Sequence, residues 1–276
     1  MKKVGFAILV TFILFNTAVA GSDTSENQGQ KGRKTYVLVV SGISKEPQDK
    51  ISMTKAVTEL QKLLKSNTEV SDQTFSILAA DDLQAKNVTE KSTAENIQKT
   101  IETIGATAEA GDGFIFYYIG QANMVGTKLR FNLPGADITH EQLSQWIKGI
   151  KASSMLIVLD CPGSGLAAKA MSGRGRVVIC SCTDEQRYRT RLSEYFLPAL
   201  TDKESDTNSD GKISILEAFT AASMQIDDWF RQNKLLTTEI PVLEDNGDGQ
   251  PSKEPWRYKL DGGDGAAAAE FFLIRE

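Results

Sequence analysis

The chain alternates continuous apolar segments with amphipathic ones, and this alternation constrains its fold more than any other feature. Residues 36–41 (YVLVVS) form an unbroken apolar run, which is typical of a strand buried on both faces of a sheet. Residues 48–65 instead carry apolar side chains at the spacing of one helical face: Met53, Val57, Leu60 and Leu64. The ordered part of the sequence therefore opens with a predicted strand–helix pair.

The same alternation continues to about residue 200. Further strands are predicted at 74–78, 114–119, 155–159 and 176–181, and further helices at 92–108, 139–150, from 166, and at 193–200. Strands that alternate with helices form parallel βαβ units, whose helices cover both faces of the sheet. We therefore predict an α/β fold, a three-layer α-β-α sandwich with a mostly parallel sheet. In such sheets, ligands and catalytic groups gather beyond the carboxyl ends of the strands.

Residues 1–20 have the pattern of a secretory signal peptide. A basic start at Lys2 and Lys3 precedes an apolar run at 4–15, and an A-x-A cleavage site ends at Ala20. The apolar run is shorter than the ~20 residues of a membrane span. We therefore expect an exported protein, periplasmic or secreted, with no membrane span after cleavage and with a polar, flexible leader at 21–34.

Charge and cysteine content exclude two classes of protein. The formal net charge is −5, and Lys and Arg are scattered, so no basic stripe for nucleic acid is evident. Three cysteines do not make a disulfide scaffold, and their odd number leaves at least one thiol free or paired with another chain in an oxidising compartment. The apolar core must therefore hold the fold, and no nucleic-acid partner is expected.

Beyond the α/β region at 35–201 the composition becomes acidic and polar. Residues 202–250 are predicted to be an EF-hand-type calcium-binding segment that includes one helix at 215–230. Residues 251–276 are predicted to be a tail, and the composition of 270–275 (EFFLIR) fits a last strand.

Residues 206–217 (DTNSDGKISILE) fill every position of an EF-hand calcium loop. Calcium prefers hard oxygen ligands, which such a loop supplies from positions 1, 3, 5, 7, 9 and 12. The chain has the matching residues Asp206, Asn208, Asp210, Lys212 (through its carbonyl), Ser214 and Glu217. Gly211 occupies position 6, where the chain turns sharply. Ca²⁺ is therefore the predicted cofactor, and the alternative is an ordinary polar turn at Asp210-Gly211.

A second acidic segment, 244–249 (EDNGDG), offers ligands at Glu244, Asn246 and Asp248. Its twelfth position is Pro255, which has no carboxylate, so the segment is either a degenerate second calcium site paired with the first or an acidic turn. Residues 262–265 (GGDG) lack any ligand spacing and are predicted to be a loop.

Residues 158–165 (VLDCPGSG) place the Cys161 thiol just after a predicted buried strand and before a helix, whose amino terminus favours a thiolate. Here the chain resembles the caspase–legumain-like (clan CD) cysteine peptidases. In that α/β fold a His-Gly follows one strand, and a Cys in a D-x-C-x-S-G-like motif ends the next. The resemblance extends from about residue 36 to about residue 246. It is closest to a bacterial secreted branch with an FNLPG segment (131–135), a Glu-Tyr-Phe (194–196) and acidic loops near the end.

The chain departs from this family at both catalytic positions. Gln121 stands where the family has its histidine, and glutamine cannot accept a nucleophile's proton. With Ser164-Gly165 aligned, the family cysteine falls on Pro162, and Cys161 lies one place early. Cys161 and Gln121 are therefore only degenerate candidates for a catalytic centre, and the plain reading of Cys161 is a small buried residue.

The single histidine of the chain, His140, does not fill the vacant catalytic position. Thr139 and Gln142 have the spacing of a capping box, so His140 is expected to be an exposed residue in the first turn of a helix. We therefore do not expect His140 to act as a base.

The signal peptide and the calcium loop, taken with this resemblance and its departures, imply an exported calcium-binding protein that has lost peptidase activity and acts in binding or scaffolding. A peptide or protein would then bind in the former substrate groove. Arg187, Arg189 and Arg191 lie where such folds build a specificity pocket, and they either receive an acidic ligand or form a solvated face. The alternatives are an active calcium-dependent cysteine peptidase that uses Cys161 and a structural module that calcium braces.

Overall fold

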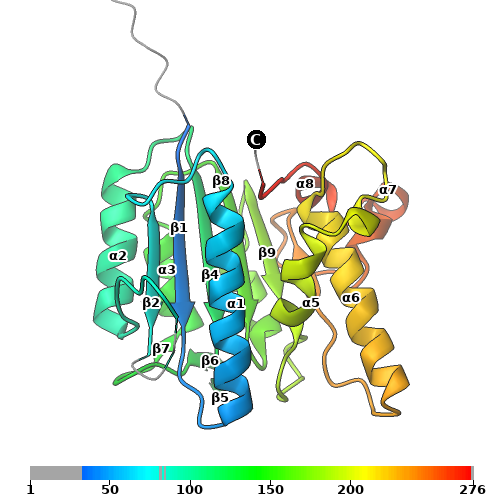
Figure 1. Cartoon of the computed structure of the whole chain (residues 1–276), viewed down its shortest axis with the longest axis horizontal. Helices are drawn as coiled ribbons and strands as arrows, with labels where there is room; N and C mark the ends of the chain where they lie inside the picture. Colours follow the sequence, from blue (N-terminus) through cyan, green and yellow to red (C-terminus); the bar gives the residue numbers. More distant parts are fainter. Residues whose placement is uncertain (1–32, 81–82, 84, 275–276) are drawn as a thin grey trace, which may run out of the picture. The chain divides into compact units, whose positions relative to one another are not determined.

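A central sheet of seven strands organises the chain (Figure 1). The computed structural model describes residues 33–80, 83 and 85–274, all of which belong to one unit, Gly32–Glu276. The predicted signal peptide lies outside the described residues, as does the predicted leader up to residue 32. The strands are, in their order across the sheet, β10 (Val242–Glu244), β9 (Arg176–Cys180), β8 (Ser154–Asp160), β4 (Gly113–Ile119), β1 (Thr35–Ser41), β2 (Phe75–Ala79) and β3 (Glu90–Lys91).

Neighbouring strands of this sheet are parallel except for β10, which runs antiparallel to β9. β1 pairs with β2 on one side and with β4 on the other, so the chain changes direction across the sheet at β1. The predicted α/β class with a mostly parallel sheet is therefore confirmed.

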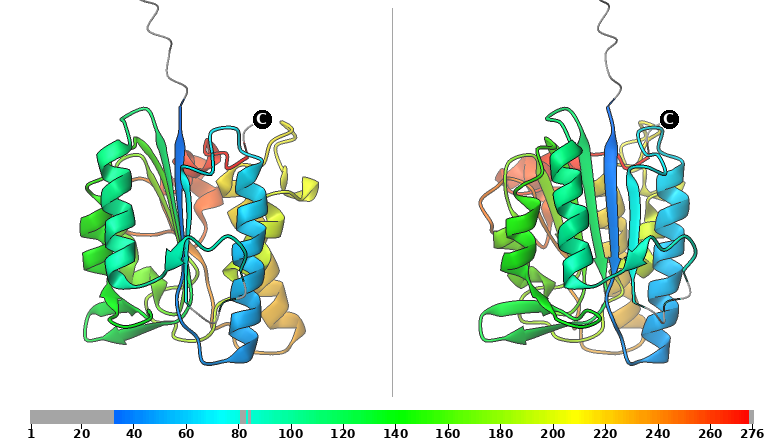
Figure 2. Two further views of the ribbon diagram at one scale, coloured as in Figure 1. Left: turned by 60° about the vertical axis from the view of Figure 1, so that its left-hand side comes forward. Right: turned by 90° about the vertical axis from the view of Figure 1, so that its left-hand side faces the viewer.

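Helices cover both faces of the sheet because its strands are apolar on both sides. Val37 and Val39 pack into the cluster on one face, and Leu38 and Val40 into the cluster on the other. The first face is covered by α1 (Pro47–Lys65), α5 (Leu192–Ala199) and α6 (Ile215–Gln232), and the second by α2 (Ala94–Thr107), α3 (His140–Ile147) and α4 (Ala168–Met171). Figure 2 shows α1 and α2 on opposite sides of β1.

Several short elements were not predicted. A three-stranded antiparallel sheet, formed by β5 (Ala122–Val125), β6 (Lys128–Phe131) and β7 (Ile138–Thr139), follows β4. Short helical elements fill connections and the end of the chain: η1 (Ser164–Ala167), η2 (Lys203–Ser205), η3 (Pro255–Arg257), α7 (Tyr258–Asp261) and α8 (Ala266–Ala269).

The last strand predicted at 270–275 is wrong for the residues that the structure describes. Residues 270–274 form no strand, and Phe272 makes a single antiparallel bridge with Ser214. The antiparallel edge strand is β10 instead, which has only three residues and no readable alternation. Among the described residues, no helix is long and apolar enough to cross a membrane.

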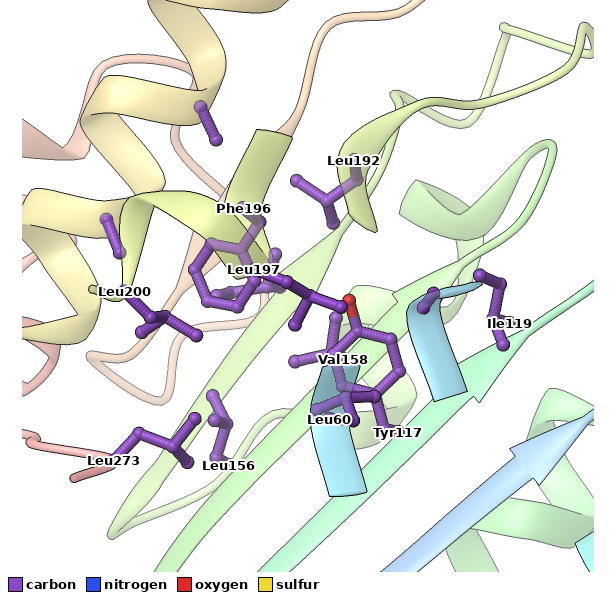
Figure 3. Close-up of a cluster of buried hydrophobic side chains, with 14 of the residues drawn as sticks. Leu60, Tyr117, Ile119, Leu156, Val158, Leu192, Phe196, Leu197, Leu200 and Leu273 are labelled. Carbon is purple, nitrogen blue, oxygen red and sulfur yellow. The ribbon is translucent and has the colours of Figure 1, made fainter. Parts of the chain in front are cut away.

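The core on the α1 face depends on large side chains from α1, α5 and the central strands. Figure 3 shows Leu60 of α1 beside Tyr117 of β4 and Val158 of β8, with Phe196 of α5 close by. Leu60 is 1% exposed. These contacts fix α1 on the sheet, and α1 forms one wall of the cleft described below.

Leu60→Ala is expected to lower the free energy of unfolding by about 2–5 kcal/mol, because it removes buried methyl groups and leaves a cavity. Chemical denaturation followed by circular dichroism measures the change. Leu236→Ala is the matched control, since Leu236 is 87% exposed and loses little when shortened. Equal destabilisation by the two substitutions would contradict this account of the core.

Candidate functional sites

A narrow cleft lies beyond the carboxyl ends of β4 and β8, where the sequence predicted a catalytic centre. Its volume is about 40 Å³, enough for a few water molecules. Its walls come from α1, from the two strand ends, from the segment before α5 and from the first turn of α5; they include Asp49, Ser52, Gln121, Pro162, Arg189 and Glu194.

The structure brings the two predicted catalytic positions to adjacent strand ends. Ile119 of β4 pairs in register with Asp160 of β8, so Gln121 and Pro162 follow neighbouring residues and both line the cleft. The Gln121 side chain donates a hydrogen bond from Nε2 to Asp49 Oδ2 at 2.7 Å. Neither position offers a nucleophile or a base.

Cys161 is 0% exposed. Burial raises the pKa of the Cys161 thiol well above its usual value, and the neighbouring Cys182 and Asp160 add to the rise. The expectation that the following helix favours a thiolate is therefore wrong, since burial outweighs any effect of the short elements η1 and α4 that follow Cys161. Cys161, Cys180 and Cys182 are all free and buried, so no disulfide forms among them.

Asp160, at the end of β8, serves the fold. Its Oδ1 accepts a hydrogen bond from Thr190 Oγ1 at 2.6 Å, and its Oδ2 accepts from the Ser193 backbone N–H at 2.9 Å and from the Ser193 hydroxyl. Burial raises the pKa of the Asp160 carboxyl, although these hydrogen bonds oppose the rise. The carboxylate thus satisfies the first turn of α5, where backbone N–H groups otherwise lack partners.

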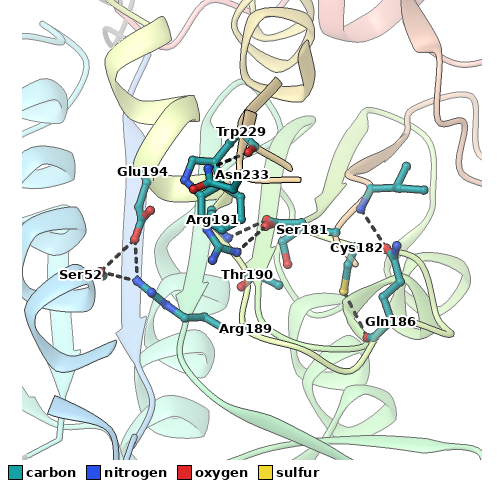
Figure 4. Close-up of polar contacts among 12 residues, drawn as sticks. Ser52, Ser181, Cys182, Gln186, Arg189, Thr190, Arg191, Glu194, Trp229 and Asn233 are labelled. Atoms are coloured by element: carbon teal, nitrogen blue, oxygen red, sulfur yellow. Dashed lines mark hydrogen bonds and ion pairs between the residues drawn. The ribbon is translucent and has the colours of Figure 1, made fainter. Parts of the chain in front are cut away.

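Arg189 lines the cleft and forms ion pairs and hydrogen bonds with its other side chains (Figure 4). Its Nε lies 3.0 Å from Asp49 Oδ1, and its terminal nitrogen lies 2.7 Å from Glu194 Oε1 and 2.9 Å from Ser52 Oγ. Ser52 Oγ also donates to Glu194 Oε1 at 2.9 Å. The guanidinium is therefore matched by two carboxylates already present in the cleft.

The other two arginines of this segment are also engaged within the chain. The Arg191 guanidinium lies 3.7 Å from the centre of the Trp229 ring and 3.9 Å from Glu239 Oε2. Arg187 donates to the carbonyl of Asp184. Arg187 is exposed, as the solvated-face alternative has it, whereas Arg189 and Arg191 are partly buried and paired within the chain.

His140 differs from its sequence prediction. The capping box of Thr139 and Gln142 is present at the start of α3, but His140 is only 7% exposed. Its Nδ1 accepts a hydrogen bond from the Leu129 backbone N–H at 3.2 Å. The unpredicted strand β6 therefore covers this residue and uses its ring nitrogen.

The first loop, residues 206–217, has the backbone of a calcium loop. Ser209 and Gly211 adopt left-handed conformations (φ 60° and 81°), which fold positions 1 to 6 into a tight turn. Asp206 Oδ2 accepts the Gly211 N–H at 3.0 Å, and Asp210 Oδ1 accepts the Lys212 N–H at 2.8 Å. The donor set is entirely oxygen, with three carboxylates, which fits a hard divalent cation such as calcium.

The end of the first loop is held by a second capping box. The Ser214 hydroxyl and the Glu217 carboxylate each accept the other's backbone N–H at the start of α6. Glu217 is buried and bridges back to the beginning of the loop, where its Oε1 accepts the Thr207 N–H at 3.1 Å. The Glu217 carboxylate at position 12 therefore connects Ser214, at position 9, with the start of the loop at positions 2 and 3.

The first loop pairs with the C-terminal segment, residues 264–273. The Ile215 N–H donates to the Phe271 carbonyl at 2.8 Å, beside the bridge between Ser214 and Phe272. Ser252, after the second acidic segment, bridges Leu243 instead. The hypothesis that the second segment pairs with the first loop is therefore wrong.

Of the second candidate set, Glu244 is buried, whereas Asn246 and Asp248 are exposed. Asp264 was not among the predicted ligands. It lies in the predicted loop at 262–265 and accepts a hydrogen bond from the Asp245 N–H of this segment. Within the part of the chain that the structure describes, no three His, Cys, Asp or Glu side chains are arranged as a ready-made metal site. Their oxygens instead accept backbone N–H groups.

No protein-family model matches the sequence, and no curated protein matches it. Among solved structures, the described chain is similar to the crystal structure of drICE, a caspase. The identity is 12%, the match covers 77% of this chain and 87% of that chain, and the TM-score is 0.44. This likeness concerns the fold alone.

The buried thiols give a prediction on reactivity. Iodoacetamide at pH 8 is expected to modify none of the three cysteines of the native protein and all three in guanidinium chloride, because alkylation needs an accessible thiolate. Intact-mass spectrometry counts the adducts. One rapid adduct in the native protein, mapped to Cys161, would contradict the buried placement of that thiol.

Proposed function

We propose that the protein is an exported calcium-binding protein whose α/β domain binds or scaffolds a peptide or protein partner and does not hydrolyse peptide bonds. The observation that carries the calcium part is the geometry of the first loop. Six ligand positions of the required type stand on a backbone with left-handed turns at positions 4 and 6.

We further propose that the domain is a degenerate member of the caspase–legumain-like fold. Gln121 and Pro162 line adjacent strand ends at the two positions where that family carries its histidine and cysteine. The nearby Cys161 thiol is buried, and the pKa shift disfavours its thiolate. Acyl transfer by a cysteine requires an exposed thiol with a base beside it; the Cys161 thiol is buried, and Gln121 stands where the family has its base.

Calcium titration by isothermal calorimetry tests the first loop. Glu217→Gln is expected to weaken binding at this loop at least tenfold, because it removes a carboxylate from position 12, and losing even an outer-shell partner commonly costs about 10–100-fold. Asp210→Asn is a second variant that removes a carboxylate from position 5. The exposed asparagine side chain can still accept the hydrogen bond from the Lys212 N–H. Glu204→Gln, an exposed acid just before the loop, is the control and should bind as the wild type does. Unchanged titrations in both loop variants would refute the assignment.

Peptide cleavage tests the loss of activity. The mature protein, with calcium or with a chelator, is expected to leave a diverse peptide library intact, because the Cys161 thiol is buried and the family's histidine position holds Gln121. Circular dichroism checks that the protein is folded. Cleavage that disappears in Cys161→Ala would overturn the degenerate assignment and favour a calcium-dependent peptidase.

A further inference from the structure

The second loop, residues 244–252, repeats the backbone of the first loop. Positions 4 and 6 are left-handed in both, at Ser209 and Gly211 in the first (φ 60° and 81°) and at Gly247 and Gly249 in the second (φ 88° and 76°). Glycine adopts this conformation readily and serine rarely, and its recurrence at the same two positions indicates that the two loops share one turn.

The ligand side chains of the second loop also make the hydrogen bonds of the first. In the second loop Asn246 Oδ1 accepts the Asp248 N–H at 2.8 Å, and Asp248 Oδ1 accepts the Gln250 N–H at 2.7 Å. In the first loop positions 3 and 5 accept from positions 5 and 7 in the same way, each at 2.8 Å. The side chains at positions 3 and 5 are therefore placed alike in both loops.

Asp264 takes the place of the missing carboxylate at position 12. In the first loop one oxygen of Glu217 accepts the N–H groups of positions 2 and 3, at 3.1 and 3.3 Å, and the other accepts that of position 9, at 2.9 Å. Asp264 Oδ1 accepts the N–H groups of positions 2 and 3 of the second loop, Asp245 and Asn246, at 3.0 and 3.3 Å. Its Oδ2 accepts that of position 9, Ser252, at 3.0 Å.

Asp245 holds Asp264 in this position. Its two carboxylate oxygens accept the backbone N–H groups of Gly265 at 2.7 Å and Ala268 at 2.8 Å. A Cβ at Gly265 would lie 2.2 Å from the Pro255 carbonyl oxygen, so only glycine allows this close approach. Asp264 of the C-terminal segment thus accepts hydrogen bonds from the second loop, and Asp245 of the second loop accepts hydrogen bonds from the C-terminal segment.

Glu244, at position 1, has a buried carboxylate oxygen that no group of the described chain satisfies. Its side chain is 0% exposed, and its Oε1 accepts the Gly247 and Gly249 N–H groups at 2.7 and 3.2 Å, so the carboxylate lies within the turn. Its Oε2 is buried and has no hydrogen-bond partner. Among the described residues, no ion pair involves Glu244, Asp248 or Asp264. A buried, unpartnered carboxylate oxygen is costly unless a cation meets it.

We propose that the second loop is a calcium site completed from outside the loop, in which Asp264 of the C-terminal segment supplies the carboxylate that Pro255 cannot. The other ligands are Glu244, Asn246, Asp248 and the Gln250 carbonyl. The site has three carboxylates, as the first loop does, and takes a hard divalent cation. It extends the proposed calcium binding but does not depend on the first loop.

Native mass spectrometry of the mature protein in calcium acetate counts the ions, and isothermal calorimetry gives their affinities. The wild type is expected to bind two calcium ions. Asp264→Asn is expected to lose one of them, with affinity at that site falling at least about tenfold. The matched control is Asp261→Asn, an exposed acid three residues earlier that caps Gly263, and it should still bind two ions.

Asp248→Asn keeps the proposal testable if Asp264→Asn fails to fold, because Asp248 is exposed and asparagine can still accept the Gln250 N–H. It should lose the same ion as Asp264→Asn, whereas Asp210→Asn should lose the other. A wild type with one ion that only Asp210→Asn removes would overturn the second site and leave the first. One ion that only Asp248→Asn removes would support the second site and refute the first. No bound ion would refute both.

Discussion

The need to cover both faces of the central sheet determines where everything else in this chain lies. The central strands β1, β4 and β8 are buried on both sides, so the connections between them run as helices across one face or the other. The carboxyl ends of the strands then gather at one edge, where the cleft forms, and α5 carries the chain back to the opposite edge before α6 begins. Figure 1 shows the first loop and α8 near the end of the sheet where β1 starts.

The C-terminal segment, residues 264–273, ties together the parts at that opposite edge. Asp264 bonds the second loop, Phe271 and Phe272 pair with the end of the first loop, and the Leu273 carbonyl accepts a hydrogen bond from Asn67 after α1 at 2.7 Å. Cations at either loop would therefore strengthen contacts across one connected region. A cation at either loop would lie at the opposite end of the sheet from the cleft, so its proposed effect is on the stability of the domain.

The sequence predicted the long elements well and the short ones poorly. Strands buried on both faces and helices with one apolar face leave patterns that do not depend on the rest of the fold, as at 36–41 and 48–65. Strand β10 has three residues, too few to show alternation, and β6 alternates polar and buried apolar residues over only four positions. Because β6 was not predicted, His140 was expected to be exposed. A residue in the first turn of a helix is buried only when another element covers it, and here that element is β6.

The candidate sites divide in the same way. The first loop was readable because all its proposed ligands lie within twelve consecutive residues, and spacing along the chain is what a motif records. The second loop failed that test only at position 12, since Pro255 stands there. Asp264 could not be predicted from spacing, because it lies outside the loop in the sequence. Only the folded chain places it beside the loop, where the hydrogen bond from the Gly265 N–H to Asp245 holds it. Residue spacing can therefore reveal a site whose ligands all come from one segment. A site that needs a ligand from a second segment is recognised only in the structure, here from the backbone N–H groups whose hydrogen bonds the carboxylates accept.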